Sequence, residues 1–177
     1  MDMVRDCMRD ARDFGVCLIK KGHEVGVRGA EPEAIGCRAR IADWNMEQLG
    51  LLQIATVGTE RFRITGLKSE ADGLLVAVTE TIDHEAPLPV PVEFTACTTL
   101  LERIVAQFAR GSEESGASDD QRPIAEPYRF GDASWVGNRL CEILPISLAA
   151  KQKLMELTDA PTRLSIVQQY LKQQKII

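Results

Sequence analysis

The chain has 177 residues and a mass of 19.6 kDa, with 45% hydrophobic and 27% charged residues, which is the balance of an ordinary folded protein. Its 21 basic and 26 acidic residues give a formal net charge of −5. This charge makes nucleic acid an unlikely partner, because such binding depends on contacts from Lys and Arg to phosphate. The longest purely apolar run, Leu74 to Val78, is far shorter than the roughly 20 residues of a membrane helix. With no secretory signal at Met1 either, the sequence predicts a cytoplasmic protein without a membrane partner.

The first half of the chain is predicted to be rich in β-strands. A short helix with one apolar stripe is expected over Val4 to Ala11, a strand over Phe14 to Ile19, and a loop over Gly22 to Glu33. Alternating apolar residues then predict further strands. These are Ile35 to Ala42, Leu51 to Val57, Arg61 to Leu67 and Leu74 to Ile82, separated in part by turns at Gly58-Thr59-Glu60 and at Lys68 to Gly73. Short strands joined by tight turns indicate an antiparallel barrel or sandwich.

A boundary is predicted at Pro87, Pro89 and Pro91, because proline neither donates to a ladder nor continues a helix. It divides the chain into a β-rich subdomain, residues 1–91, and a helical subdomain, residues 92–177. The latter opens with a helical stripe from Phe94 to Phe108 that ends near Gly111. A mobile loop is expected over residues 111–123, which contain no large apolar side chain.

Three more helices are predicted after this loop. Asp132 or Ser134 can cap the first, which Pro145 ends, and Ser147 can cap the second. Pro161 suits the first turn of the last helix. The C-terminal half is therefore predicted to be a helical bundle.

Residues able to support catalysis are scarce. His23 and His84 are the only histidines, and neither has a recognisable nucleophile motif nearby. The sequence has no phosphate-binding P-loop and no closely spaced metal ligands, so neither a cofactor nor a metal is expected. The cysteines are odd in number, widely spaced and never CxxC, and we expect buried free thiols at Cys7, Cys17, Cys37, Cys97 and Cys141.

A binding surface is the alternative to a catalytic site. Arginine and tryptophan are enriched at binding hot spots, and they recur on the predicted polar strand faces. The candidate residues for binding protein or peptide are Arg38, Arg40, Trp44, Arg61 and Arg63. A purely structural reading is also open, in which the arginines keep the outer sheet face soluble and Trp44 closes one end of a barrel.

An ordered set of segments resembles the N-terminal domain of the bacterial Lon protease and its stand-alone relatives. The segments are Phe14-Gly15-Val16, the run from Ile35 to Trp44, Leu52-Gln53-Ile54, Gly58 to Ile64, Ala133 to Ile146, Leu148 to Leu157 and Asp159 to Leu171. They cover nearly the whole chain, and no single one of them is catalytic.

The resemblance implies an α+β fold, in which a PUA-like antiparallel β pseudo-barrel is followed by a helical bundle. It also implies a non-catalytic protein that binds peptides or unfolded or partner polypeptides, in substrate recognition or an adaptor role related to ATP-dependent proteolysis. The ATPase and the Ser-Lys protease of full Lon lie on other domains, and the chain carries neither. An RNA-binding PUA-like module is the alternative, and an enzyme based on His23 or His84 is a third hypothesis.

One departure from the family affects the predicted sheet. The family places about two Pro-rich apolar strands before the helix that here begins at Met1. We therefore expect either a longer natural protein or a sheet edge completed by another chain, which would allow self-association through an incomplete edge.

Overall fold

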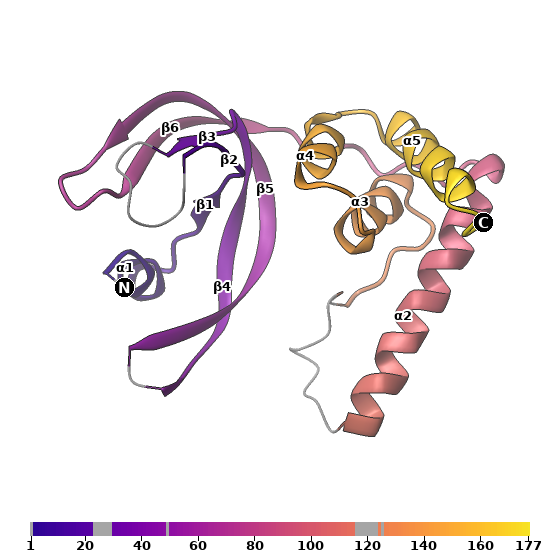
Figure 1. Ribbon diagram of the computed structural model, residues 1–177, viewed down its shortest axis with the longest axis horizontal. Coiled ribbons are helices and arrows are strands. Elements are labelled where there is room, and N and C mark those ends of the chain that lie inside the picture. Colours follow the sequence, from indigo (N-terminus) through magenta and orange to yellow (C-terminus); the bar gives the residue numbers. More distant parts are fainter. Residues whose placement is uncertain (1, 23–29, 49, 116–123, 125) are drawn as a thin grey trace. The chain divides into compact units, whose positions relative to one another are not determined.

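A computed structural model describes residues 2–22, 30–48, 50–115, 124 and 126–177. The chain divides into two compact units, Met1–His84 and Glu85–Ile177 (Figure 1), and each is described here by itself. The first, unit 1, combines a helix with an antiparallel sheet, and the second, unit 2, is helical. This is the mixed fold with an antiparallel sheet that the sequence predicts.

Unit 1 is built around a four-stranded antiparallel sheet of order β1-β4-β5-β6 (Figure 1). Strands β2 and β3 form a separate two-stranded sheet. The elements, in chain order, are α1 (Asp2–Asp10), β1 (Phe14–Val16), β2 (Ile19–Lys21), β3 (Glu31–Pro32), β4 (Ile35–Gln48), β5 (Leu51–Ser69) and β6 (Leu75–Ile82). The two long strands, β4 and β5, pair along almost their whole length and form the centre of the unit.

Two strand predictions are corrected by the structure. The segment Gly58-Thr59-Glu60 is not a turn, because β5 continues through it as one strand. Cys37 pairs with Arg61 and Ala39 with Gly58, so β5 has one extra residue there, which forms a bulge. The single strand expected over Phe14 to Ile19 is instead divided between β1 and β2. The turn before β6 is confirmed, and Gly73 there has a φ of +91°, which favours glycine.

Phe62 packs against two glycines on one face of the sheet. A Cβ atom added to Gly15 would lie 2.9 Å from the Phe62 ring, and one added to Gly36 would lie 2.7 Å from it. Added to Gly36, the Cβ would also lie 2.6 Å from the backbone oxygen of Val16. The ring therefore occupies space that only glycine leaves open, and Phe62 is 4% exposed.

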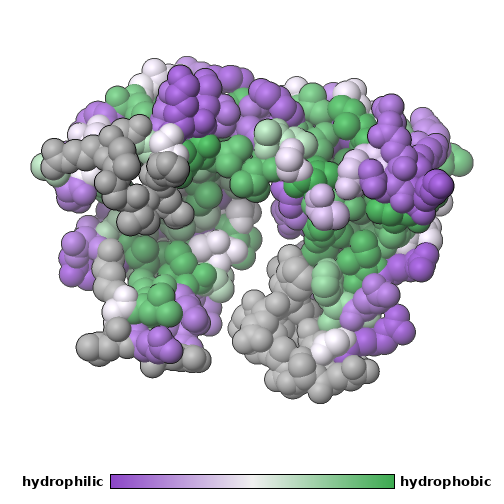
Figure 2. All heavy atoms as spheres, viewed as in Figure 1, coloured by the Kyte–Doolittle hydropathy of each residue, from purple (hydrophilic) through white to green (hydrophobic). Residues whose placement is uncertain are grey.

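The apolar core of unit 1 is small. Among the described residues, its buried hydrophobic side chains are Cys7, Ile35, Ala39 and Phe62. Many of its large apolar side chains are exposed, namely Met8, Val16, Ile19, Trp44, Met46, Leu51, Val57, Leu67, Leu74, Leu75, Val76 and Val78. Figure 2 shows hydrophobic surface over the strands of this unit. Exposed apolar area of this kind marks interaction surfaces in folded proteins.

In the residues that the structure describes, unit 2 consists of a short 3-10 helix followed by four α-helices. These are η1 (Val92–Phe94), α2 (Thr95–Ser115), α3 (Ala133–Ile143), α4 (Leu148–Glu156) and α5 (Ala160–Gln173). The predicted caps are present: the Asp132 carboxylate accepts from the Ser134 amide at 3.0 Å, and the Ser147 hydroxyl from the Ala150 amide at 3.2 Å. Helix α2 runs past Gly111 to Ser115, so the start of the predicted loop is helical. The rest of that loop, residues 116–123, lies outside the described residues.

The apolar core of unit 2 contains more buried side chains than that of unit 1. The helical stripe predicted from Phe94 is confirmed as far as Val105, whereas Phe108 at its end is exposed, and Cys97 and Leu101 on it are fully buried. They pack with buried residues of the later helices, which include Val136, Leu140, Leu164, Val167 and Leu171. The rings of Tyr128, Phe130 and Trp135 cluster beside this core, with the last two edge to face at 5.3 Å between centroids. Burial on this scale supplies most of the stabilisation of a folded domain.

A charged pair lies within the core of unit 2. The Arg163 side chain is 1% exposed, and it forms an ion pair with Glu85, which is 9% exposed. Arg163 Nη1 donates to Glu85 Oε2 at 2.9 Å, and Nη2 donates to the other carboxylate oxygen. Arg163 Nε donates to the Leu154 carbonyl at 3.1 Å, and the Leu157 carbonyl is another acceptor. The buried guanidinium is thus satisfied by hydrogen bonds that connect the first residue of unit 2 to α4 and α5.

All five cysteines are free thiols. Cys7 and Cys97 are buried, as expected, whereas Cys17, Cys37 and Cys141 are half-buried. Burial raises the pKa of the Cys17 and Cys97 thiols, and it raises the pKa of Cys141 to about 11. In the part of the chain that the structure describes, no helix is long and apolar enough to cross a membrane.

Candidate functional site

Arg38 lies on the same face of the sheet as Phe62. Its guanidinium carbon is 5.8 Å from the centroid of the Phe62 ring, and its Nη2 donates to the Thr79 hydroxyl at 3.0 Å. Glu60 Oε2 lies 3.9 Å from Arg38 Nε, which is within ion-pair distance and beyond a hydrogen bond. These contacts connect β4 to β5 and β6, although the buried Arg38 Nε itself has no hydrogen-bond partner among the described residues.

Arg40 is held by a carboxylate at the start of β1. Arg40 Nε donates to Asp13 Oδ1 at 3.0 Å, and the Thr59 hydroxyl donates to Asp13 Oδ2 at 2.8 Å. These hydrogen bonds lower the pKa of the Asp13 carboxyl below its usual value, and the bond from Arg40 has the largest effect. The Arg40 side chain is still largely exposed, so it can contact a ligand without leaving Asp13.

Arg61 and Arg63 lie on the opposite face of the sheet. Residues that face each other across an antiparallel pair project on the same side. Arg61 is opposite Cys37, and Arg63 is opposite Ile35, whereas Phe62 is opposite Gly36. The strand register therefore separates Arg61 and Arg63 from Arg38, and the sheet does not bring the four arginines together on one face.

Trp44 lies on the hairpin that β4 and β5 form beyond β1. Trp44 is directly opposite Ile54, and Met46 and Leu52 follow two positions along their strands toward the turn. We call these four side chains the hairpin face. The neighbouring positions, Asp43, Asn45 and Gln53, place polar groups on the other side of the hairpin.

The hairpin face is apolar and accessible. Trp44 is 52% exposed, so the expectation that it closes a barrel end does not match its place in unit 1. Met46 is also exposed, and Leu52 and Ile54 are half-buried. Of the five predicted binding residues, Trp44 is the one that presents a large apolar surface. The other three members of the hairpin face were missed, although the apolar alternation at 44/46 and 52/54 is visible in the sequence.

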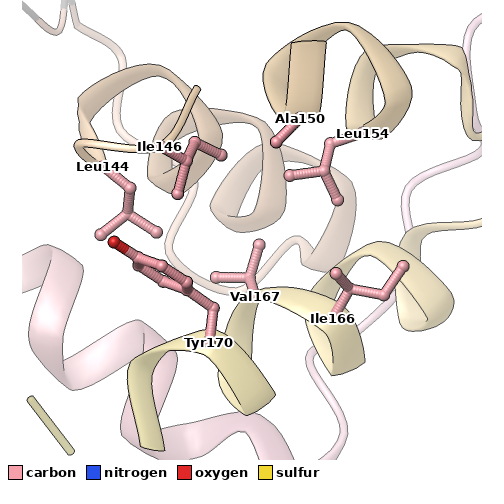
Figure 3. Close-up of a pocket in the computed structure, with 7 residues that line it drawn as sticks. All are labelled: Leu144, Ile146, Ala150, Leu154, Ile166, Val167 and Tyr170. Carbon is pink, nitrogen blue, oxygen red and sulfur yellow. The ribbon is translucent and has the colours of Figure 1, made fainter. Parts of the chain in front are cut away.

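A second apolar feature is a pocket in unit 2 (Figure 3). It has a volume of about 90 Å³ and is lined by side chains from the segment that follows α3, from α4 and from α5. The lining residues are Leu144, Ile146, Ala150, Leu154, Ile166, Val167 and Tyr170. Apart from the Tyr170 hydroxyl these side chains carry no polar group, so the pocket suits one apolar side chain of a ligand and offers no chemistry.

The described part of the chain contains no cluster of three His, Cys, Asp or Glu residues that could hold a metal ion. His84 is exposed at the end of unit 1, and His23 lies outside the described residues. What the described residues bring together is the accessible apolar surface of the hairpin face. Such surfaces bind other molecules through burial of apolar area.

Comparison with known proteins identifies a family for this chain. The family model for the ATP-dependent protease La (LON) substrate-binding domain matches residues 1–173. The chain is also similar to a solved structure described as a Lon N-terminal domain protein from Xanthomonas campestris, with a TM-score of 0.72 and 28% identity, over 96% of this chain and 82% of that one. A second similar structure is the N-terminal domain of the Mycobacterium avium complex Lon protease, with a TM-score of 0.49 and 15% identity, over 86% and 74% of the two chains. No match was found among curated proteins.

Proposed function

Because the chain belongs to the ATP-dependent protease La (LON) substrate-binding domain family, we propose that it binds unfolded or partner polypeptide segments without cleaving them. A substrate-binding role related to proteolysis follows from the family. The finer proposal is a role as a recognition or adaptor protein. The observation that supports it is the match of the substrate-binding domain family over residues 1–173.

The hairpin face is the surface we assign to this binding. Apolar segments are what unfolded polypeptides expose and folded ones bury, so an accessible apolar face distinguishes the two. Trp44 supplies the largest apolar contact, and tryptophan is among the commonest hot-spot residues. Arg40 is opposite Val57 whereas Trp44 is opposite Ile54, so Arg40 projects on the other face of the sheet and is a secondary candidate for pairing with acidic groups of a bound segment. Arg61, Arg63 and Arg38 are secondary candidates, since they lie on the body of the sheet.

Trp44 provides the direct test. The chain has two tryptophans, one in each unit, so in a Trp135→Phe variant the fluorescence comes from Trp44 alone. On addition of a reduced and carboxymethylated protein, which cannot fold, Trp44 emission is expected to shift to shorter wavelength as water leaves the ring. A Trp44→Ala variant should bind at least about tenfold more weakly, as measured by the anisotropy of the labelled polypeptide, which corresponds to roughly 1.4 kcal/mol.

Two controls make the test specific. Leu148→Ala removes an even more exposed apolar side chain from unit 2 and should leave binding unchanged. The same polypeptide with its disulfides intact and folded should not bind. Wild-type affinity in the Trp44→Ala variant would exclude the hairpin face, and appearance of peptide fragments during incubation with ATP would contradict the absence of cleavage.

A further inference from the structure

Strand β6 is an open edge of the sheet in unit 1. Within the described residues it pairs with β5 on one side only, along a register from Ser69 opposite Leu75 to Arg61 opposite Ile82. In a strand, backbone N–H and C=O groups point alternately to the two sides, so every second residue of β6 directs its pair away from β5. The outer side of β6 is therefore a row of available donors and acceptors.

The edge lacks the usual features that prevent strand pairing. Natural proteins protect such edges with proline, with lysine, with bulges or with very short strands. Strand β6 has none of these: it runs Leu-Val-Ala-Val-Thr-Glu-Thr-Ile without interruption, and the bulge opposite it is in β5, between Ile64 and Gly66. Glu80 is its only charged residue. The opposite edge differs, since β1 has only three residues.

The side chains along the edge are apolar and exposed. Val78 is 69% exposed and stands over Gly66, whose added Cβ would contact it at 3.6 Å. Leu75 and Val76 are also exposed. Leu75 and Val76 project to opposite faces of the sheet, so a strand added beside β6 finds apolar neighbours on both of its faces. An extended segment with alternating apolar or β-branched residues matches this edge best.

The size of the edge favours a reversible ligand over a permanent second copy. Eight residues at about 3.4 Å each give a length of about 27 Å, and a sheet is about 10 Å thick. Two copies paired through β6 alone would therefore bury about 540 Å² in total, well below the 1,200 Å² or so at which stable interfaces begin. A single extended peptide needs no such area, because its main chain hydrogen-bonds along the whole strand.

We infer that β6 binds an extended segment of another polypeptide by strand addition, with a preference for alternating apolar and β-branched residues. This inference rests on the proposed function and adds the conformation and residue pattern of the segment that is bound. The hairpin face and the β6 edge then contact different parts of an unfolded chain, the first through side chains and the second through the main chain.

Hydrogen exchange followed by NMR tests the inference on the whole protein. In the free protein, every second amide of β6 should exchange quickly, and those amides should become protected when the reduced and carboxymethylated polypeptide is added. A capped peptide of alternating valine and threonine should give the same protection, whereas its backbone N-methylated form should give none. Only pairing through the main chain predicts that N-methylation of the peptide removes the protection.

A charged edge provides the matched mutation. Val76→Lys with Val78→Lys should abolish the protection and weaken peptide binding at least about tenfold, while Val92→Lys, at an 88% exposed site in unit 2, should change neither. Thermal unfolding by circular dichroism checks that the double variant folds. The N-methylated peptide tests main-chain pairing on the unmutated protein. Binding of the unfolded polypeptide without protection of β6 overturns this inference and leaves the proposed function intact. Absence of any binding overturns both, and protection that depends on the protein's own concentration would assign the edge to a second copy instead.

Discussion

The ion pair between Arg163 and Glu85 is the contact of unit 2 whose loss should reduce stability most. Both side chains are buried, and a buried charge that loses its partner is far more costly than an exposed one. We expect Glu85→Ala to reduce the free energy of unfolding of unit 2 by about 3–5 kcal/mol, because the guanidinium stays buried without its carboxylate. Chemical denaturation followed by Trp135 fluorescence measures this change.

An exposed pair serves as the control for that substitution. Lys153 and Glu156 form an ion pair at 2.8 Å on the surface of α4, and Lys153→Ala should change the stability by less than about 1 kcal/mol. Equal effects of the two substitutions would show that Glu85 contributes no more than a surface carboxylate does. The sequence alone does not indicate this pair, since the two partners are far apart along the chain and an arginine is expected on the exposed face of a helix, not on its buried face.

Helix α5 depends on a titratable cap. The Asp159 carboxylate accepts from the Thr162 amide at 2.8 Å, and hydrogen bonds from Thr162 hold the pKa of Asp159 below its ordinary value of 3.8. Because the pKa is lower in the folded state, the stabilisation is complete above the unfolded-state pKa and is lost as the pH falls through the folded-state pKa. The melting temperature of Asp159→Ala should therefore lie below that of the wild type near pH 7, and the difference should shrink toward about pH 3.

Asparagine at the same position separates capping from titration. Asp159→Asn keeps a side-chain acceptor for the Thr162 amide, so the variant should keep part of the stability and show a weaker dependence on pH. A constant difference between Asp159→Ala and the wild type over the whole pH range would contradict the role of the ionised carboxylate.

Helices were more predictable than strands in this chain. Local signals such as Asp132, Ser147 and Pro161 mark helix starts, because a cap acts within one turn of its own residue. The division of β5 at Gly58-Thr59-Glu60 was wrong for the opposite reason. A bulge and a turn use similar residues, and only the pairing with Cys37 and Ala39 on β4 distinguishes them.

The candidate site shows the same limit. The alternation in the sequence is compatible with Ile35 and Phe62 on the same buried face of the sheet. All the arginines would then lie on the opposite face. The structure pairs Phe62 with Gly36 instead, because the ring fits over glycine, and the register then assigns the arginines to different faces. Trp44 could be named as a candidate without knowledge of the register, because tryptophan is enriched at binding hot spots.

At the scale of the whole molecule, the two units differ in how well they are packed. All but four of the buried apolar residues belong to the core of unit 2, and unit 1 has a small core below a largely exposed sheet. We expect unit 1 to unfold at a lower denaturant concentration, because less apolar area leaves water when it folds. A Trp135→Phe variant reports on unit 1 and a Trp44→Phe variant on unit 2, so fluorescence distinguishes the two transitions.

A ligand should alter only one of these transitions. The unfolded polypeptide binds to folded unit 1 in our proposal, so it should raise the midpoint reported by Trp44 and leave that reported by Trp135 unchanged. Coincident midpoints for the two variants, with or without polypeptide, would show that the units unfold together.

The free thiols have a consequence for redox chemistry. A thiol reacts with oxidants and alkylating reagents as its thiolate, and with a pKa of about 11 only about one Cys141 side chain in ten thousand is ionised at neutral pH. Burial shifts the pKa of Cys17 and Cys97 in the same direction. These three thiols should therefore resist oxidative cross-linking while the chain is folded. Reaction with a thiol reagent would then measure how often each unit opens.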